Sequence, residues 1–159
     1  MGSRPKVSLA YIAGFLDGDG SLMLQIKKRR DSARAMRIMS TIVFYQDTRH
    51  EAPLHWIRKI LGIGYLSRRN DGMSELRING FVQTRDILSE LLPFIRFKKV
   101  QARALLKAAT MLARTKMNKL TSPQLSRIAD CIFAVQNANY VTRRKKNKSE
   151  IRRLLGLTP

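Results

Sequence analysis

The sequence is poor in acidic residues, cysteine and histidine, and each shortage excludes a class of protein. Its 159 residues include 11 Asp and Glu against 31 Lys and Arg. The single cysteine, Cys131, has no partner for an internal disulfide, and with only 2 histidines no spacing typical of a zinc site occurs. No apolar run approaches the length that crosses a membrane, and the first residues lack the apolar core of a signal peptide. We therefore expect a soluble, intracellular protein.

The formal net charge of +20 is the main feature that remains. Such an excess repels itself in a compact fold, and a polyanionic partner is its natural explanation. Basic membrane-binding proteins concentrate their cations on one amphipathic helix, whereas here cations occur along most of the chain. Apolar residues make up 44%, which is typical of a globular protein with a core. We expect nucleic acid as the partner, without a membrane or a small-molecule substrate.

Hydrophobic periodicity predicts an α+β fold. Helical spacing predicts helices at 7–16, 53–61, 81–92, 98–114, 122–138 and 149–155. Two hairpins interrupt them: strands 21–29 and 37–46 with a turn at Asp31–Ala35, then strands 64–69 and 74–79 with a turn at Asn70–Gly72. This order favours an antiparallel sheet with helices on one face. We expect one domain over residues 1–159, with a core at about 6–114 and a helical C-terminal extension at about 120–159.

The sheet face opposite the helices is predicted to bind DNA. Alternation places the following side chains on it: Met23, Gln25, Lys27, Arg29, Arg37, Met39, Thr41, Ser67, Arg69 and Arg77. Val43 and Tyr45 share this face and either contact thymine methyl groups or flank the groove. A two-stranded ribbon fits the major groove, where Arg and Lys suit guanine and Gln suits adenine. The C-terminal stretch is expected to be a loosely ordered arm that contacts phosphates through Arg143, Arg144, Lys145 and Lys146.

The segment Asp17-Gly18-Asp19-Gly20 places two of the few acids at the end of an apolar helix. One interpretation is a turn, since Asp-Gly between apolar runs is a strong turn signal. A calcium loop is excluded, because the fifth position is Ser21 and the twelfth is Lys28. The third interpretation is a magnesium site, where a carboxylate joins the carbonyl groups that a helix end leaves without partners. Two acids on a DNA-facing surface would oppose phosphate unless a cation lay between them.

The same helix carries a face of small residues, which predicts close approach of a second helix. We expect a homodimer interface formed by Leu9, Ala10, Ala13, Gly14 and Asp17. For Asp17 a structural role at the helix end is favoured over a role as ligand. Two copies would bring two acidic clusters together near a two-fold axis, and duplex DNA has two strands to cut.

The stretch "YIAGFLDGDGS" resembles the signature of the LAGLIDADG homing endonucleases, and "IGYL" and "LLPFIRFKKVQA" extend the resemblance over most of the chain. It implies the αββαββα fold with a saddle-shaped antiparallel sheet and, with one motif, the homodimeric intron-encoded subfamily. The resemblance implies Asp19 and the Gly18 carbonyl as magnesium ligands. It further implies Gln46 as a water-organising residue, Lys98 or its neighbour Lys99 near the scissile phosphate, and a basic residue at Arg49 or His50, where the register favours His50.

The expected activity is magnesium-dependent cleavage of both strands of a long, pseudo-palindromic site, leaving 3′ overhangs. Mn²⁺ or Ca²⁺ could occupy the site, and Ca²⁺ is not expected to support cleavage. Two alternatives remain open at this point: an intron RNA maturase, and a non-enzymatic basic RNA-binding protein. Genes for LAGLIDADG homing endonucleases lie in introns of organelles, archaea and bacteria, so the resemblance leaves the compartment undecided.

Overall fold

The computed structural model describes residues 3–30 and 32–159, with the backbone alone described at 32–35. Its elements follow the predicted order. They are α1 (Lys6–Asp19), β1 (Gly20–Arg29), β2 (Ser32–Asp47), the 3-10 turn η1 (Thr48–His50), α2 (Ala52–Leu61), β3 (Tyr65–Arg68), β4 (Met73–Asn79), α3 (Phe81–Leu91), α4 (Lys99–Arg114), the 3-10 turn η2 (Met117–Lys119), α5 (Ser122–Ala138) and α6 (Lys148–Leu154).

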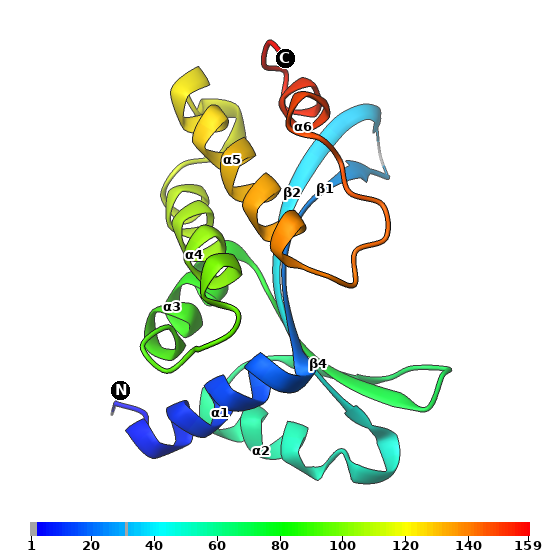
Figure 1. The fold of residues 1–159 in the computed structure, drawn as a ribbon, viewed down its shortest axis with the longest axis vertical. Helices are drawn as coiled ribbons and strands as arrows, with labels where there is room; N and C mark the ends of the chain where they lie inside the picture. Colours follow the sequence, from blue (N-terminus) through cyan, green and yellow to red (C-terminus); the bar gives the residue numbers. More distant parts are fainter. Residues whose placement is uncertain (1–2, 31) are drawn as a thin grey trace.

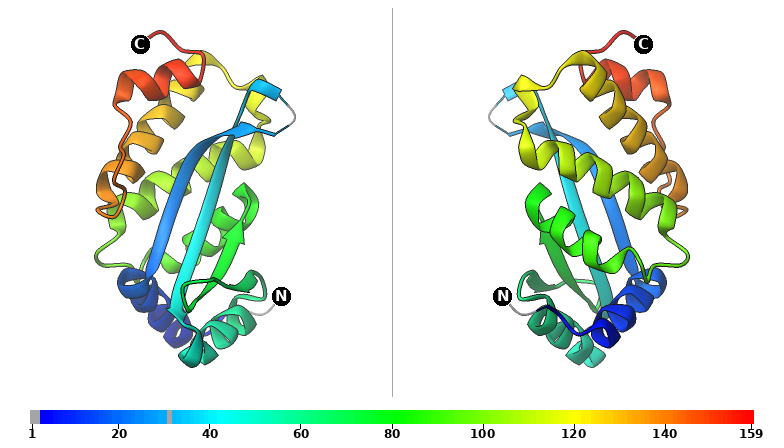
Figure 2. Two further views of the ribbon diagram at one scale, coloured as in Figure 1. Left: turned by 90° about the vertical axis from the view of Figure 1, so that its right-hand side faces the viewer. Right: turned by 90° about the vertical axis from the view of Figure 1, so that its left-hand side faces the viewer.

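The four strands form one antiparallel sheet in the order β1-β2-β4-β3. Figure 1 shows the sheet nearly edge-on, with α3, α4 and α5 along one face and α1 and α2 across one end. The other face is open, and β1 and β2 rise from α1 as a long curved hairpin (Figure 2, left). The predicted α+β fold, with helices on one face of an antiparallel sheet, is confirmed.

The core lies between the helices and the covered face of the sheet. Leu22 of β1, Ile42 and Phe44 of β2 and Leu76 of β4 are fully buried there, and Leu88 of α3 packs into the same cluster. Each such side chain stabilises the fold by roughly 1.5–3 kcal/mol relative to exposure. Alternation along the strands therefore fixes which side chains face the open side.

Helix α1 runs to Asp19, three residues beyond the predicted end at Leu16, so both motif acids lie in its last turn. The chain leaves the helix at Gly20, whose backbone is extended and whose N–H group donates to the Leu16 carbonyl. A turn between helix and strand was one interpretation of this segment, and the structure excludes it. Strand β1 starts directly at Gly20.

Strand β2 begins at Ser32, five residues earlier than predicted, so most of the expected turn is strand. Asp31 lies outside the described residues. The register runs regularly to Lys28 opposite Met36 and then shifts, so that Arg29 faces Ser32. This irregularity breaks the two-residue alternation of side chains near the turn. The prediction of the strand relied on that alternation, so it missed the first residues of β2.

The C-terminal segment is held at several points, which corrects the expectation of a loosely ordered arm. Within it α6 is helical, and its Ile151 is fully buried against the rest of the domain. The Gln136 side chain accepts from the Lys146 N–H group at 3.0 Å and donates to the Lys146 carbonyl at 2.5 Å. The Asn139 amide donates to the Leu22 carbonyl of β1 at 2.8 Å. These contacts hold the connection between α5 and α6 beside β1.

Candidate functional site

The two motif acids at the end of α1 point in different directions. The Asp17 carboxylate is 8% exposed and accepts from the backbone N–H groups of Arg96 at 2.6 Å, Phe97 at 3.2 Å and Lys98 at 3.0 Å. It thereby ties the end of α1 to the backbone that leads into α4, which begins at Lys99. Asp19 is exposed. The structure therefore gives Asp17 the structural role that was favoured for it and leaves Asp19 available for chemistry.

Lys98 lies beside both acids. Its side chain is buried, and its ammonium group donates to the Asp17 carbonyl at the end of α1. Burial lowers the pKa of Lys98, while the negative charges of Asp17 and Asp19 act in the opposite direction. Lys98 lines the groove described below together with Asp19, whereas Lys99 is not among the groove's lining residues. Of the two lysines, Lys98 is the one that faces the motif.

Gln46 lies near the end of β2 at the same end of the sheet, and Arg49 and His50 follow in η1. Gly20 pairs with Phe44, so Gln46, two residues further along β2, lies beside the end of α1. The side-chain amide oxygen of Gln46 accepts from the backbone N–H group of Asp47 at 2.9 Å, so the Gln46 side chain is folded back on β2. Arg49 binds Asp47 through two side-chain contacts of 3.0 and 2.7 Å.

The Arg49 side chain and backbone hold the pKa of the Asp47 carboxyl well below its usual range. Arg49 is thus committed to this ion pair, although its side chain is 82% exposed. His50, the last residue of η1, is also exposed and is the remaining candidate in η1 for the predicted active-site role.

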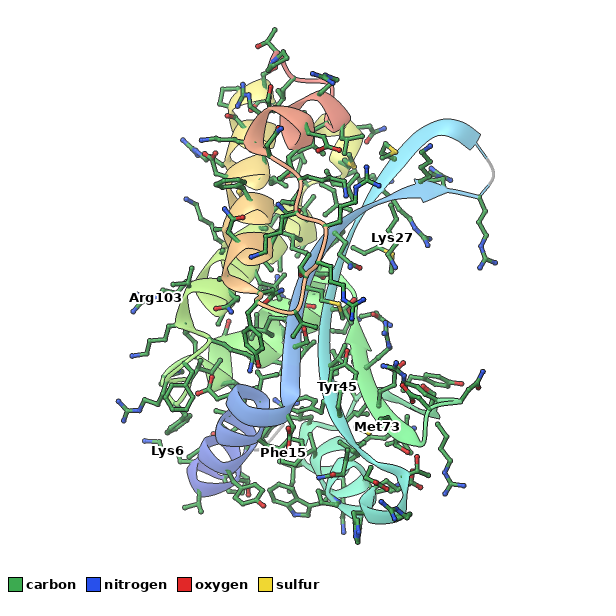
Figure 3. The ribbon with its side chains drawn as sticks, turned by 45° about the vertical axis from the view of Figure 1, so that its right-hand side comes forward. Lys6, Phe15, Lys27, Tyr45, Met73 and Arg103 are labelled. Carbon is green, nitrogen blue, oxygen red and sulfur yellow. The ribbon has the colours of Figure 1, made fainter. Side chains whose placement is uncertain are left out.

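The motif end forms one end of an open groove of about 700 Å³. Asp19 and Lys98 line it at that end, Gln25 and Lys27 of β1 line it along the sheet, and Arg144 lies in the opposite wall. Figure 3 shows Lys27, Tyr45 and Met73 on the open side of the sheet and Arg103 on the helical side. The groove therefore joins the candidate catalytic end to the basic sheet face and to the C-terminal segment.

The open sheet face holds most of the side chains predicted to bind DNA. Exposed on it are Gln25, Lys27, Arg29, Arg37 and Arg69, and partly exposed are Met23, Met39, Ser67 and Arg77. Burial contradicts base contact at two positions of this face: at Thr41, which was predicted to bind DNA, and at Val43, for which flanking the groove was the other alternative. Thr41 is 3% exposed and its hydroxyl donates to the Asn79 side-chain oxygen at 2.9 Å, and Val43 is fully buried, so neither is available to a base.

The sequence reasoning missed Glu75 and Asn79, which share the face of Arg77 on β4. Alternation along 73–79 was a signal that could have found them, because it places Glu75, Arg77 and Asn79 on one side. Glu75 is an acid within a basic surface and is 8% exposed.

Within the described residues, no group of three or more His, Cys, Asp and Glu side chains lies close enough to hold a metal ion. A single protomer therefore offers Asp19 and the carbonyl groups at the end of α1, of which Gly18 is exposed. This donor set is all oxygen, as Mg²⁺ prefers, but it is incomplete for a hexacoordinate ion. Further oxygen atoms have to come from water, from a phosphate or from a second copy of the chain.

Comparison with known proteins agrees with this geometry. The model of the family "LAGLIDADG endonuclease" matches residues 12–104. The chain belongs to the LAGLIDADG endonuclease family. It is 35% identical over 111 residues to the DNA endonuclease I-CvuI of Chlorella vulgaris, an alignment that covers 70% of this chain and 69% of the relative. It is 31% identical over 111 residues to the DNA endonuclease I-CreI of Chlamydomonas reinhardtii, an alignment that covers 70% of this chain and 68% of that relative.

The LAGLIDADG fold extends over nearly the whole chain. The crystal structure of I-CvuI in complex with its target in the presence of Ca superposes with a TM-score of 0.82 at 29% identity and covers 97% of this chain and 98% of that chain. The structure of I-CvuI with the I-CreI target in the presence of Mg, in which the DNA is not cleaved, gives a TM-score of 0.75 at 29% identity over the same shares.

The LAGLIDADG helix α1 has one face buried in its own protomer and one face exposed. Leu9, Ala13 and Asp17 are 6%, 0% and 8% exposed, so these three are not available to a partner, and the predicted interface is revised accordingly. Ala10 and Gly14 are exposed, and Gly18 follows them at the same four-residue spacing. A Cβ atom added at Gly14 or Gly18 would meet no atom within 4 Å, so the protomer itself does not require glycine there.

Exposed apolar side chains flank this LAGLIDADG helix face. Val7 and Tyr11 are 85% and 62% exposed, and the Tyr11 ring meets Trp56 of α2 edge-on with 5.5 Å between ring centroids. Phe97, whose backbone N–H group donates to Asp17 at the end of α1, is 84% exposed. Among the described helices, none is long and apolar enough to cross a membrane.

Two of the four predicted cations of the C-terminal segment line the groove, and the other two do not. Arg143, Arg144 and Lys145 are exposed, and Arg144 and Lys146 line the groove. The Lys145 ammonium donates to the Asn137 carbonyl at 2.9 Å. The segment therefore presents its cations from a backbone that is anchored on both sides.

Proposed function

We propose that the chain is a site-specific, metal-dependent DNA endonuclease that acts as a homodimer. The observation that carries this proposal is the position of Asp19. It is an exposed carboxylate at the end of a helix, beside the buried Lys98, where a groove opens onto a basic sheet face. The DNA endonucleases I-CvuI and I-CreI, each more than 30% identical to this chain, support the same activity.

The residues at the end of α1 fit a magnesium ion. Asp19 would supply a carboxylate and Gly18 a carbonyl oxygen at the negative end of the helix dipole. When bound, Mg²⁺ supplies charge stabilisation and lowers the pKa of water for attack on phosphorus. Mn²⁺ and Ca²⁺ fit the same oxygen atoms, and we expect Ca²⁺ to support DNA binding but not cleavage.

The neighbouring side chains have defined roles in this proposal. Lys98 donates from a buried position to a phosphate oxygen at the motif end and stabilises the negative charge that develops there. Gln46 and His50 orient water from the end of β2 and from η1. Arg49 keeps η1 in place through its ion pair with Asp47.

The exposed face of α1 supports the proposed homodimer. Ala10, Gly14 and Gly18 present a small surface, on which a second α1 helix can pack at short distance. Tyr11 and Phe97 extend that surface with apolar side chains that are otherwise in water. A two-fold axis along this face would bring two Asp19 residues together and supply the oxygen donors that one protomer lacks.

The open sheet face would read the DNA. Each protomer lays its strands along the major groove, so the homodimer recognises a long, pseudo-palindromic site. Cutting across the minor groove between the two half-sites would leave 3′ overhangs. Phosphate contacts from the sheet and from Arg143 to Lys146 would make binding weaken steeply with salt.

The deciding experiment compares the wild type with Asp19→Asn on a randomised duplex library with Mg²⁺. We expect the wild type to cut selected sites, and Asp19→Asn to bind the same sites while losing cleavage by a factor on the order of 10³. Asp130→Asn, which removes an equally exposed acid from α5, is the matched control and should cut normally. Normal cleavage by Asp19→Asn contradicts the assignment. A wild type that binds intron RNA and leaves all DNA intact favours the maturase alternative.

A further inference from the structure

Glu75 is a buried acid on the open, basic face of the sheet. It lies in β4, paired with Tyr45 of β2 on one side and with Ser67 of β3 on the other. Its carboxylate is 10% exposed, although the surface around it is built to meet phosphate. A carboxylate exposed on such a surface would weaken DNA binding, so its burial calls for a different role.

Two arginines hold this carboxylate. Arg77 donates from Nε to Glu75 Oε1 at 2.6 Å and from a terminal nitrogen to Oε2 at 3.4 Å. A terminal nitrogen of Arg69 lies 3.9 Å from Oε2, and the Ser67 hydroxyl donates to Oε1 at 3.4 Å. Burial raises the pKa of the adjacent Tyr45, with Arg77, Glu75 and Arg69 as its charged neighbours. The acid is therefore the centre of a cluster that spans three strands.

The contacts with Glu75 use only part of the Arg77 guanidinium group. This group has five N–H donors in a planar fork, and Glu75 engages the side that contains Nε and one terminal nitrogen. The end of the fork, between the two terminal nitrogens, carries a second pair of donors that can bind guanine O6 and N7. The Arg77 side chain is 35% exposed, so this end can reach a base while the side that contains Nε stays fixed.

Fixing the Arg77 side chain before DNA binds also lowers the entropy cost of its contact with a base. A free arginine side chain has several rotatable bonds, and immobilising it opposes binding. A fixed fork also meets only the base with matching acceptors, whereas a mobile arginine can turn to a phosphate instead. Glu75 thereby converts a general cation into a selective donor.

We propose that Glu75 is a positioning residue for specificity, which orients Arg77 so that the protein prefers guanine at the base pairs that Arg77 faces. The inference rests on the proposed function in taking duplex DNA as the partner and a homodimer as the form that binds it. It goes beyond that function because it assigns sequence preference to an acid that does not itself contact DNA.

The test is a binding-site selection from a randomised duplex library with Ca²⁺, read by sequencing, for wild type and Glu75→Gln. Gln is nearly isosteric and keeps the neutral contacts, so the fold is retained. We expect the guanine preference to fall on the order of ten-fold at one symmetric pair of positions, with the other positions unchanged. Arg77→Met should lose the same preference, and adding Glu75→Gln to Arg77→Met should change nothing further.

Asp86→Asn is the matched control, because it removes an acid that pairs with an arginine away from the open sheet face, Arg85 of α3, and is 54% exposed. Its base preferences should equal those of the wild type. A Glu75→Gln profile equal to the wild type, or one that weakens all positions evenly, overturns the proposal. If Glu75→Gln does not fold, Glu75→Asp takes its place. It draws the carboxylate back by one methylene and should lower the same guanine preference. A Glu75→Asp profile equal to that of the wild type overturns the proposal as well.

Selection by binding requires no cleavage, which separates this proposal from the nuclease assignment. A wild type that binds a preferred site and never cuts it contradicts the endonuclease function alone. A wild type that cuts, with a Glu75→Gln variant of unchanged preference, contradicts the role of Glu75 alone.

Discussion

Replacement of Asp17 by asparagine tests the different roles of the two motif acids. The Asp17 carboxylate accepts from three successive backbone N–H groups at 2.6, 3.2 and 3.0 Å and is 8% exposed. Asparagine keeps one oxygen and turns an NH₂ group toward donors that it cannot bind. The variant therefore loses the charge on the acceptor and leaves at least one buried N–H group without a partner.

The magnitude follows from these contacts. A hydrogen bond to a charged group contributes about 1.5–3 kcal/mol, and a buried donor left unsatisfied costs about 1–3 kcal/mol. We expect Asp17→Asn to lower the free energy of unfolding by about 2–4 kcal/mol. For a chain of this size the melting temperature should fall by roughly 5–15 °C.

Urea denaturation followed by circular dichroism, together with thermal unfolding, measures this loss. Asp19→Asn is the control two residues away, and because Asp19 is exposed its stability should stay within about 0.5 kcal/mol of the wild type. A loss below 1 kcal/mol for Asp17→Asn, or equal losses for the two variants, would refute the assignment of Asp17 to structure and Asp19 to chemistry.

Two further predictions concern the interface and the pH dependence of stability. Gly14→Leu should give a monomer on a sizing column with an unchanged fold, since the chain's own atoms leave room at this position. Gly14→Ala is the control and should remain dimeric. A dimeric Gly14→Leu variant would place the interface elsewhere. Hydrogen bonds from Arg68 and Ser74 lower the pKa of Glu51 from 4.5 to about 2, so its stabilising effect is present above pH 4.5 and is lost as pH falls toward 2. Thermal unfolding should therefore show a difference between wild type and Glu51→Gln at neutral pH that shrinks between pH 4.5 and 2, and a constant difference would contradict it.

Local signals predicted those parts of the fold that short-range physics determines. Gly62 was expected to end α2, and it adopts the left-handed backbone of a helix C-cap with φ of 69°. The helix predicted at 122–138 is α5 as observed. In these cases the residues that decide the structure lie within a few positions of one another.

Features that depend on distant partners could not be predicted in the same way. Helix α1 is apolar on every side, so periodicity could not show that Leu9 and Ala13 face the protomer's own core while Gly14 faces outward. The burial of Thr41 depends on the register that places Asn79 opposite it on β4. The cluster around Glu75 likewise needs three strands in register before its charges meet.

Helix α1 exposes Ala10 and Gly14 on its outer face and ends in Asp19, so in the proposed function one helix would serve both self-association and catalysis. An unpaired copy would then offer one Asp19 carboxylate and should not cut both strands. At low expression, the rate of double-strand cleavage should rise with the square of the protein concentration. It should become proportional to the concentration only when nearly all copies are dimeric.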